Sequence, residues 1–114
     1  MSQDPVTTNP DFYKVVFENE RVRVLEYQDT PGDATTMHRH PDCVMITMSS
    51  FRRRLVHGEQ EREVDIPVGM AGWVPAQEHR GENIGDTPTH CFFVELKEAA
   101  PGGSRPAERL GPAD

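Results

Sequence analysis

The sequence is poor in cysteine and leucine, and it contains no long run of apolar residues. Its two cysteines, Cys43 and Cys91, are too few for a disulfide framework, so we expect both to be thiols. No stretch approaches the ~18 consecutive apolar residues that a membrane-spanning helix requires. The first five residues carry neither the basic nor the apolar region of a signal peptide. We therefore expect a cytoplasmic protein with no membrane partner.

Positive charge is also scarce. Twelve Lys and Arg stand against 19 Asp and Glu, which gives a formal net charge of −7 at pH 7. Such a chain repels a polyphosphate backbone, because binding to nucleic acid depends on neutralising phosphates with cations. We expect no nucleic-acid partner.

Apolar residues are unevenly distributed along the 114 residues, a length with room for one core. Residues 1–10 and 99–114 contain few of them, and the second segment is rich in Pro, Gly and Ala. We predict a flexible N-terminal segment over residues 1–10, a single folded domain over residues 11–98 and a flexible, disordered C-terminal tail over residues 99–114.

Valine outnumbers leucine by eleven to four, and no window shows the spacing of an amphipathic helix. Because β-branched side chains are stiff at χ1, this composition favours strands. The sequence predicts an all-β sandwich or barrel. The expected strands are Tyr13–Phe17, Arg21–Tyr27, Thr35–His40, Cys43–Met48, Arg52–His57, Glu61–Ile66, Gly72–Val74 and His90–Lys97.

Three of the five histidines occur in patterns with a chemical meaning. In Gly32-x5-His38-x-His40, two imidazoles at positions i and i+2 of a strand lie on one face, about 6.6–7 Å apart, with Thr36 beside them. Further along the chain, Gly69-x5-Pro75 is followed by His79 and then by Asn83. His38, His40 and His79 are therefore the candidate ligands of one metal ion.

These two patterns resemble the two sequence motifs of the cupin family, and the resemblance spans roughly residues 12–98. It implies a single-domain cupin-type double-stranded β-helix, the jelly-roll barrel of RmlC-like proteins, and the homodimers that similar cupins often form. The strings Phe12-Tyr13-Lys14-Val15-Val16-Phe17-Glu18-Asn19 and Glu82-Asn83-Ile84-Gly85 are similar to a group of small single-domain bacterial cupins. Some of that group are named for β-alanine degradation, a label that we do not transfer as an activity.

The sequence departs from the cupin pattern where a fourth ligand is usual. Val44 and Met45 stand where the first motif usually has a glutamate, so three histidines remain to hold a divalent transition metal. Three neutral imidazoles suit Fe, Zn, Ni, Cu or Mn and leave open positions for a small-molecule substrate. With iron, the resemblance to three-histidine cupin dioxygenases implies oxidation of a diketone or a thiol; with zinc, bound water favours hydrolysis or lyase chemistry.

Two other interpretations stay open. The chain could be a non-catalytic cupin that binds or senses a small ligand, or a structural protein with a vestigial site. No residue is convincing as a nucleophile, and catalytic residues are not assigned.

Five further residues are candidates to line the site. If a hairpin turns at Ile84-Gly85, the register places His90 opposite His79. Cys43 and the carboxylate of Glu78 are candidates too, as are Asp42 and Glu82. The alternatives are a half-buried strand histidine, an inert buried thiol and ordinary surface acids.

Several other residues are expected to be structural. Asn83 suits a turn, because its side chain can hydrogen-bond the nearby backbone, and His57 suits a solvated hairpin. We expect the run Arg52-Arg53-Arg54 to lie on a solvated hairpin opposite acidic residues. Trp73 is expected to pack inside the barrel.

Overall fold

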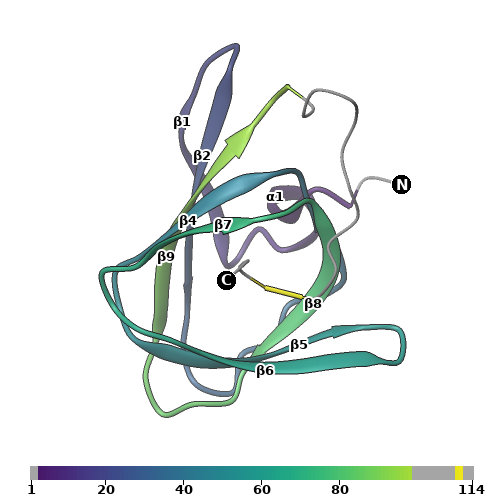
Figure 1. The fold of residues 1–114 in the computed structure, drawn as a ribbon, viewed down its shortest axis with the longest axis vertical. Helices are drawn as coiled ribbons and strands as arrows, with labels where there is room; N and C mark the ends of the chain where they lie inside the picture. The colour runs from purple at the N-terminus through teal and green to yellow at the C-terminus, as the bar shows by residue number, and fades with distance from the viewer. Residues whose placement is uncertain (1–2, 99–109, 112–114) are drawn as a thin grey trace.

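The computed structural model describes residues 3–98 and 110–111, and its strands wrap around a single interior (Figure 1). One sheet has five strands in the order β1-β2-β9-β4-β7, and the other has four in the order β3-β8-β5-β6. The predicted all-β class is confirmed. The elements are α1 (Pro5–Thr8), β1 (Tyr13–Glu18), β2 (Val22–Asp29), β3 (His38–His40), β4 (Cys43–Thr47), β5 (Phe51–His57), β6 (Gln60–Ile66), β7 (Ala71–Val74), β8 (Gln77–Asn83) and β9 (Thr89–Leu96).

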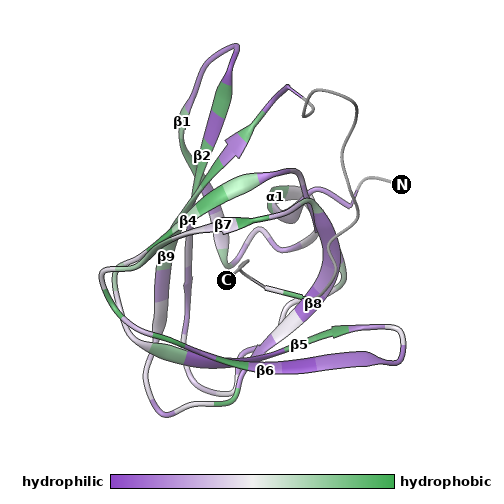
Figure 2. Cartoon of the chain, viewed as in Figure 1, coloured by the Kyte–Doolittle hydropathy of each residue, from purple (hydrophilic) through white to green (hydrophobic). Residues whose placement is uncertain are grey.

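The strands alternate between an inner and an outer face, as a half-buried sheet requires. Along β4, Cys43, Met45 and Thr47 are buried while the residues between them are not. Figure 2 shows that hydrophilic residues run along β6 and β8 and hydrophobic ones along β4. The same alternation corrects the prediction for Trp73, which is 42% exposed, since β7 turns Val74 inward instead.

The strand β8 is absent from the predicted set. Its sequence, Gln-Glu-His-Arg-Gly-Glu-Asn, has no apolar alternation, yet its residues are alternately buried and less buried. The inner face of this strand is polar because it faces the interior site and not the apolar core. The predicted strand Thr35–His40 is shorter in the structure, where β3 begins at His38.

The described N-terminal residues are ordered against the barrel, which corrects the prediction of a flexible segment over residues 1–10. Asp4 caps α1 by accepting a hydrogen bond from the Val6 amide at 2.9 Å, and the Arg39 amide on β3 donates to the Gln3 carbonyl at 2.7 Å. Asn9 is 5% exposed. These contacts cover the edge of β3 that β8 does not pair.

The predicted tail over residues 99–114 lies mostly outside the described residues. Of the two tail residues that are described, Leu110 is 3% exposed and belongs to the core, and the Gly111 amide donates to the Gln77 side-chain oxygen at 2.8 Å. These two residues lie inside the curve of β8 and β5 (Figure 1). No helix in the described part of the chain is long and apolar enough to cross a membrane.

Candidate metal centre

The pairing of β3 with β8 brings the three predicted histidines together. The strands are antiparallel, with His38 directly opposite His79 and His40 opposite Gln77. Ring centroids of His38 and His40, and of His38 and His79, are both 4.9 Å apart, and those of His40 and His79 are 5.5 Å apart. One ring nitrogen from each of the three lies within 4.8 Å of the others. These three imidazoles could therefore hold one metal ion.

Each of the three rings uses its Nδ1 atom in a hydrogen bond to an oxygen. His38 Nδ1 donates to the Thr36 carbonyl at 2.8 Å, and His79 Nδ1 to the Gln77 side-chain oxygen at 2.9 Å. His40 Nδ1 lies 3.4 Å from one carboxylate oxygen of Glu95. Arg23 contacts the other oxygen of the same carboxylate. Because an oxygen acceptor faces each Nδ1, the proton belongs there, and each Nε2 keeps its lone pair for a metal ion or a hydrogen-bond donor.

Tyr13, on β1 of the five-stranded sheet, contacts two of the three histidines. Its hydroxyl oxygen lies 3.3 Å from His38 Nε2 and 3.2 Å from His40 Nε2. Burial raises the pKa of Tyr13 well above its usual value, so the phenol keeps its proton. One hydroxyl proton can satisfy only one of the two nitrogens, so an acceptor lone pair is left without a donor from Tyr13.

His38 and His79 are held in the neutral form that ligates metals. Burial, together with the nearby His40, lowers the pKa of His38 to about 3, and the same causes lower the pKa of His79 well below its usual value. Three buried imidazoles whose ring nitrogens converge fit a divalent transition metal. The glutamate that the cupin pattern usually supplies is absent, and Met45 faces the interior in its region.

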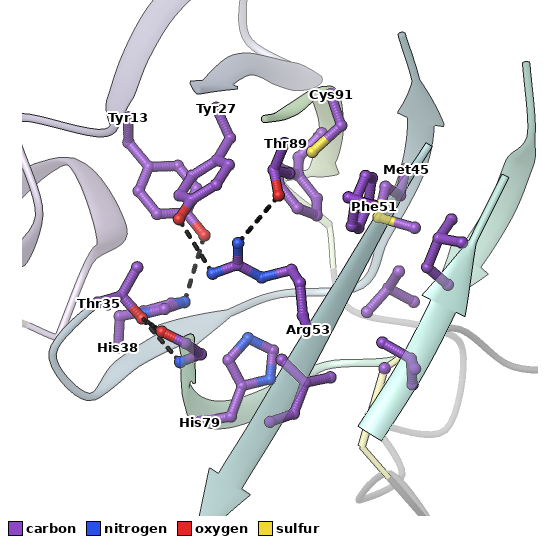
Figure 3. A pocket seen from close by; sticks show the side chains of 17 residues that line it. Tyr13, Tyr27, Thr35, His38, Met45, Phe51, Arg53, His79, Thr89 and Cys91 are labelled. Carbon is purple, nitrogen blue, oxygen red and sulfur yellow. Dashed lines mark hydrogen bonds between the residues drawn. The ribbon is translucent and has the colours of Figure 1, made fainter. Parts of the chain in front are cut away.

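A cavity of about 60 Å³ adjoins His38, His79 and Tyr13. Its polar wall also includes Tyr27, Thr35, Arg53 and Thr89, and Figure 3 shows these side chains pointing toward one another. Its apolar wall consists of Met45, Phe51, Leu55, Val64, Ile66, Val74, Cys91 and Phe93. No Asp or Glu of the described residues lines it, so the cavity offers no carboxylate as a general base.

Arg53 lies inside the barrel, contrary to the prediction for the run Arg52-Arg53-Arg54. The alternation of β5 turns Phe51, Arg53 and Leu55 inward, so Arg53 is only 8% exposed. Arg52 and Arg54 point outward and pair with Glu61 and Glu63, as expected for a solvated hairpin. Three consecutive arginines on a strand cannot all share one face, and that alternation is the signal that could have identified Arg53.

The predicted contact between His90 and His79 is wrong. It required β8 to pair with β9, but these strands belong to different sheets, and β9 instead lies between β2 and β4. His90 Nε2 contacts a Glu26 carboxylate oxygen at 2.8 Å on the outer side of the sheet. The chain between Asn83 and Thr89 crosses from one sheet to the other.

The other predicted lining residues also lie away from the cavity. Cys43 is fully buried on β4, where burial raises the pKa of its thiol, in accord with the alternative of an inert cysteine. Glu78 points outward from β8 and lies 3.7 Å from His57, which is solvated as expected. Thr36 is exposed while Thr35 lines the cavity, because the regular strand starts only at His38.

Asn83 has the structural role that was expected of it. Its side-chain amide donates to the Thr87 carbonyl at 2.9 Å and to Asp29 at 3.0 Å, and its oxygen accepts from the Gly85 amide. It therefore fixes the crossing between the two sheets.

Solved structures provide the comparison that identifies the family. A cupin domain from Bordetella pertussis is 31% identical, with a TM-score of 0.70 over 75% of this chain and 92% of that one. The chain belongs to the cupin family. This cupin also shares its fold with an RmlC-like cupin family protein from Methanocaldococcus jannaschii, which is 16% identical, with a TM-score of 0.60 over 74% of this chain and 77% of that one.

A third fold relative is an enzyme. It is a polyketide cyclase from Streptomyces resistomycificus, 17% identical, with a TM-score of 0.58 over 75% of this cupin and 64% of that protein. At that identity the likeness concerns the fold alone. No protein-family model and no curated protein matches this sequence.

Proposed function

We propose that this cupin binds one divalent transition metal ion through the Nε2 atoms of His38, His40 and His79, and acts on a small organic molecule in the adjoining cavity. The carrying observation is that every Nδ1 of the three rings faces an oxygen acceptor while the Nε2 atoms remain for a metal. Such partners orient metal-bound histidines and raise their basicity. The donor set is compatible with Fe, Zn, Ni, Cu or Mn.

The residues around the ligands define what the chain itself contributes. The polar wall orients a small molecule, the apolar wall excludes water, and the Tyr13 hydroxyl is a hydrogen-bond donor next to two of the ligand nitrogens. An iron ion would supply dioxygenase-like oxygen chemistry there, and a zinc ion would supply a Lewis acid. Because no carboxylate of the described residues lines the cavity, the proposed reaction relies on the metal and not on a side-chain base.

Elemental analysis of protein purified without chelators tests the metal site. We expect about one transition metal ion per chain, lost in His38→Ala, His40→Ala and His79→Ala. His57→Ala, which removes a histidine from an exposed hairpin, is the matched control and retains the metal. Metal-free wild-type protein, or variants of the three histidines that keep their metal, would contradict the proposal.

A second candidate function is binding or sensing of a small ligand without turnover. It is favoured by the same absence of a carboxylate from the described cavity wall. Oxygen uptake by the iron-loaded protein with diketones and thiols supports the enzyme. Ligand-induced thermal stabilisation with no product from any of them supports the binding protein.

The proposal also covers the cellular compartment and the group within the cupin family. We place it in the cytoplasm, where its two free, buried cysteines would stay reduced. Within the family, the sequences of residues 12–19 and 82–85 resemble those of the small cupins named for β-alanine degradation. This resemblance favours membership of that group.

We also propose a homodimer formed through β1, an edge strand on which Val15, Val16 and Phe17 are 39–53% exposed. Sedimentation should give twice the monomer mass of 12.9 kDa. A monomer that persists at high protein concentration would contradict the dimer.

A further inference from the structure

Arg53 occupies an unusual position for a charged residue, on the polar wall of the cavity. Its Nη1 donates to Asp29 at 2.6 Å and to Thr89 at 3.1 Å, and its Nη2 donates to the Tyr27 hydroxyl at 3.0 Å. Tyr27 in turn donates to the same Asp29 oxygen. The guanidinium is thus fixed in one orientation by partners on the other sheet.

These partners leave one edge of the guanidinium unused. A guanidinium has five N–H donors in a plane, and the three bonds above use both protons of Nη1 and one of Nη2. The Nε proton and the second Nη2 proton lie on the same edge, and no acceptor among residues 3–98 and 110–111 binds them. In Figure 3 the guanidinium lies between the Tyr27 and Thr89 hydroxyls on one side and the His79 ring on the other.

Gly81 places no side chain against these two nitrogens. It is on the inner face of β8, two residues from His79, and a Cβ at this position would lie 3.0 Å from Arg53 Nη2 and 3.4 Å from Nε. Gly81 does not have a positive φ, so the backbone conformation does not require glycine here. Any larger residue would instead press on the Arg53 guanidinium and on Leu55, whose Cδ2 would lie 3.2 Å from that Cβ.

We propose that the open edge of Arg53 binds the carboxylate of the small molecule on which this cupin acts. Two parallel N–H donors in a plane match the two oxygens of a carboxylate, and a bidentate pair of this kind is stronger and more specific than a single charged hydrogen bond. The inference rests on the proposed function, since it names the chemical class of that small molecule. The carboxylate would lie beside His79, so another group of the same molecule could reach the metal ligands.

The cavity also restricts the size of the ligand. A cavity needs about 10–15 Å³ to hold one water, so about 60 Å³ accommodates a molecule of only a few heavy atoms. The apolar wall, which includes Phe51, Leu55 and Ile66, suits a short hydrocarbon chain. This lining favours a monocarboxylate of about two to four carbons over inorganic phosphate, which has no apolar part.

Calorimetric titration of the metal-loaded protein tests the inference. The probes are acetate, propionate and butyrate, each compared with its neutral amide and with inorganic phosphate. We expect the carboxylates to bind at least about tenfold more tightly than the amides and more tightly than phosphate, as the loss of a charged hydrogen-bonded pair implies. Equal affinity for acid and amide, or tighter binding of phosphate, would overturn the assignment.

Variants locate the binding to the proposed edge. Arg53→Lys keeps the charge but loses the planar pair of donors, and Gly81→Ala keeps Arg53 but places a methyl group against Nη2 and Nε. Each should weaken carboxylate binding about tenfold or more. Arg54→Lys, on the outer face of the same strand, is the control and should bind like wild type. Wild-type affinity in a folded Gly81→Ala or Arg53→Lys protein would overturn the inference.

Metal content separates this inference from the proposed function. It is measured on every variant together with the melting temperature, and we expect Arg53→Lys and Gly81→Ala to retain their metal. If wild-type protein contains no metal but its carboxylate binding is lost in Arg53→Lys, the metal proposal fails and the carboxylate site stands. If the metal is present and neither variant changes carboxylate affinity, the carboxylate site fails alone.

Discussion

At the scale of single residues, the site depends on groups that do not themselves touch a ligand. Gln77 illustrates this, since its oxygen accepts from His79 Nδ1 and from the Gly111 amide while its nitrogen donates to the Pro75 carbonyl at 2.9 Å. These backbone partners fix the orientation of the amide. The amide in turn fixes the proton of His79 on Nδ1.

Replacing Gln77 should therefore weaken metal binding without removing a ligand. In Gln77→Met, His79 loses its Nδ1 acceptor, and we expect the metal dissociation constant to rise about 10- to 100-fold. Competition with a chromophoric chelator measures the change. Glu78→Gln, the outward neighbour on β8, is the control; unchanged affinity in Gln77→Met would show that the Nδ1 contact has no role.

The buried pair of Arg53 and Asp29 makes a second prediction at this scale. Asp29→Asn leaves the guanidinium charge without its carboxylate in the interior, which should lower the free energy of unfolding by about 3–5 kcal/mol. Glu63→Gln removes an exposed partner of Arg52 and should cost less than about 1 kcal/mol. Urea denaturation compares the two, and similar losses would mean that the interior pair is well hydrated.

At the scale of elements, the N-terminal segment supports the strand that carries two of the histidines. Asn9 connects it to the residues before β3, because its oxygen accepts from the Thr36 amide at 2.8 Å and its nitrogen contacts the Thr36 carbonyl at 3.3 Å. The same carbonyl accepts from His38 Nδ1. The segment thus stabilises the start of β3 and the orientation of His38 together.

Asn9→Ala tests this support. The variant removes a buried side chain and leaves the part-buried Thr36 amide without its partner, and we expect a loss of about 1–3 kcal/mol in the free energy of unfolding. Asp11→Ala, an exposed neighbour, is the control and should lie within about 0.5 kcal/mol of wild type. Equal stability of Asn9→Ala and wild type in chemical denaturation would be at odds with an ordered N-terminal segment.

At the scale of the whole molecule, the barrel holds the neutral imidazoles of His38 and His79 away from water, and this links its stability to pH. The pKa of His38 is about 3 in the folded chain, against about 6.5 when unfolded, and the pKa of His79 is lowered too. Between these values the unfolded chain binds more protons than the native one. Stability is therefore fully present above about pH 6.5 and is lost as the pH falls below it.

We expect metal-free protein to lose up to about 1.4 kcal/mol per pH unit for each of these histidines as the pH falls from 6.5 toward 5.5. Urea denaturation in the presence of a chelator measures the slope. His38→Gln should reduce it, whereas His57→Gln, at a solvated position, should not. A flat profile over this range would mean that the imidazoles are protonated or hydrated in the folded chain.

The fold class and part of the site could be predicted from local patterns. A strand has a period of two, so His38 and His40 had to share a face wherever their strand was placed. The valine-rich composition and the regular turns predicted strands close to those observed. β8 was missed because its inner residues are Gln77, His79, Gly81 and Asn83, and a polar interior face has no apolar alternation to detect.

Local sequence patterns could not predict which strands pair or which side chains face one another across the two sheets. The sequence by itself determined that the chain is all-β, that it has three histidines with metal-ligand spacing and that the usual glutamate is missing. The tertiary structure decided that His79 faces His38, that His90 lies outside and that Arg53 enters the cavity opposite Tyr27 and Asp29. Periodicity fixes which residues share a face, but the partner of each face depends on strand pairing between segments far apart in the chain, which the packing of the whole barrel selects.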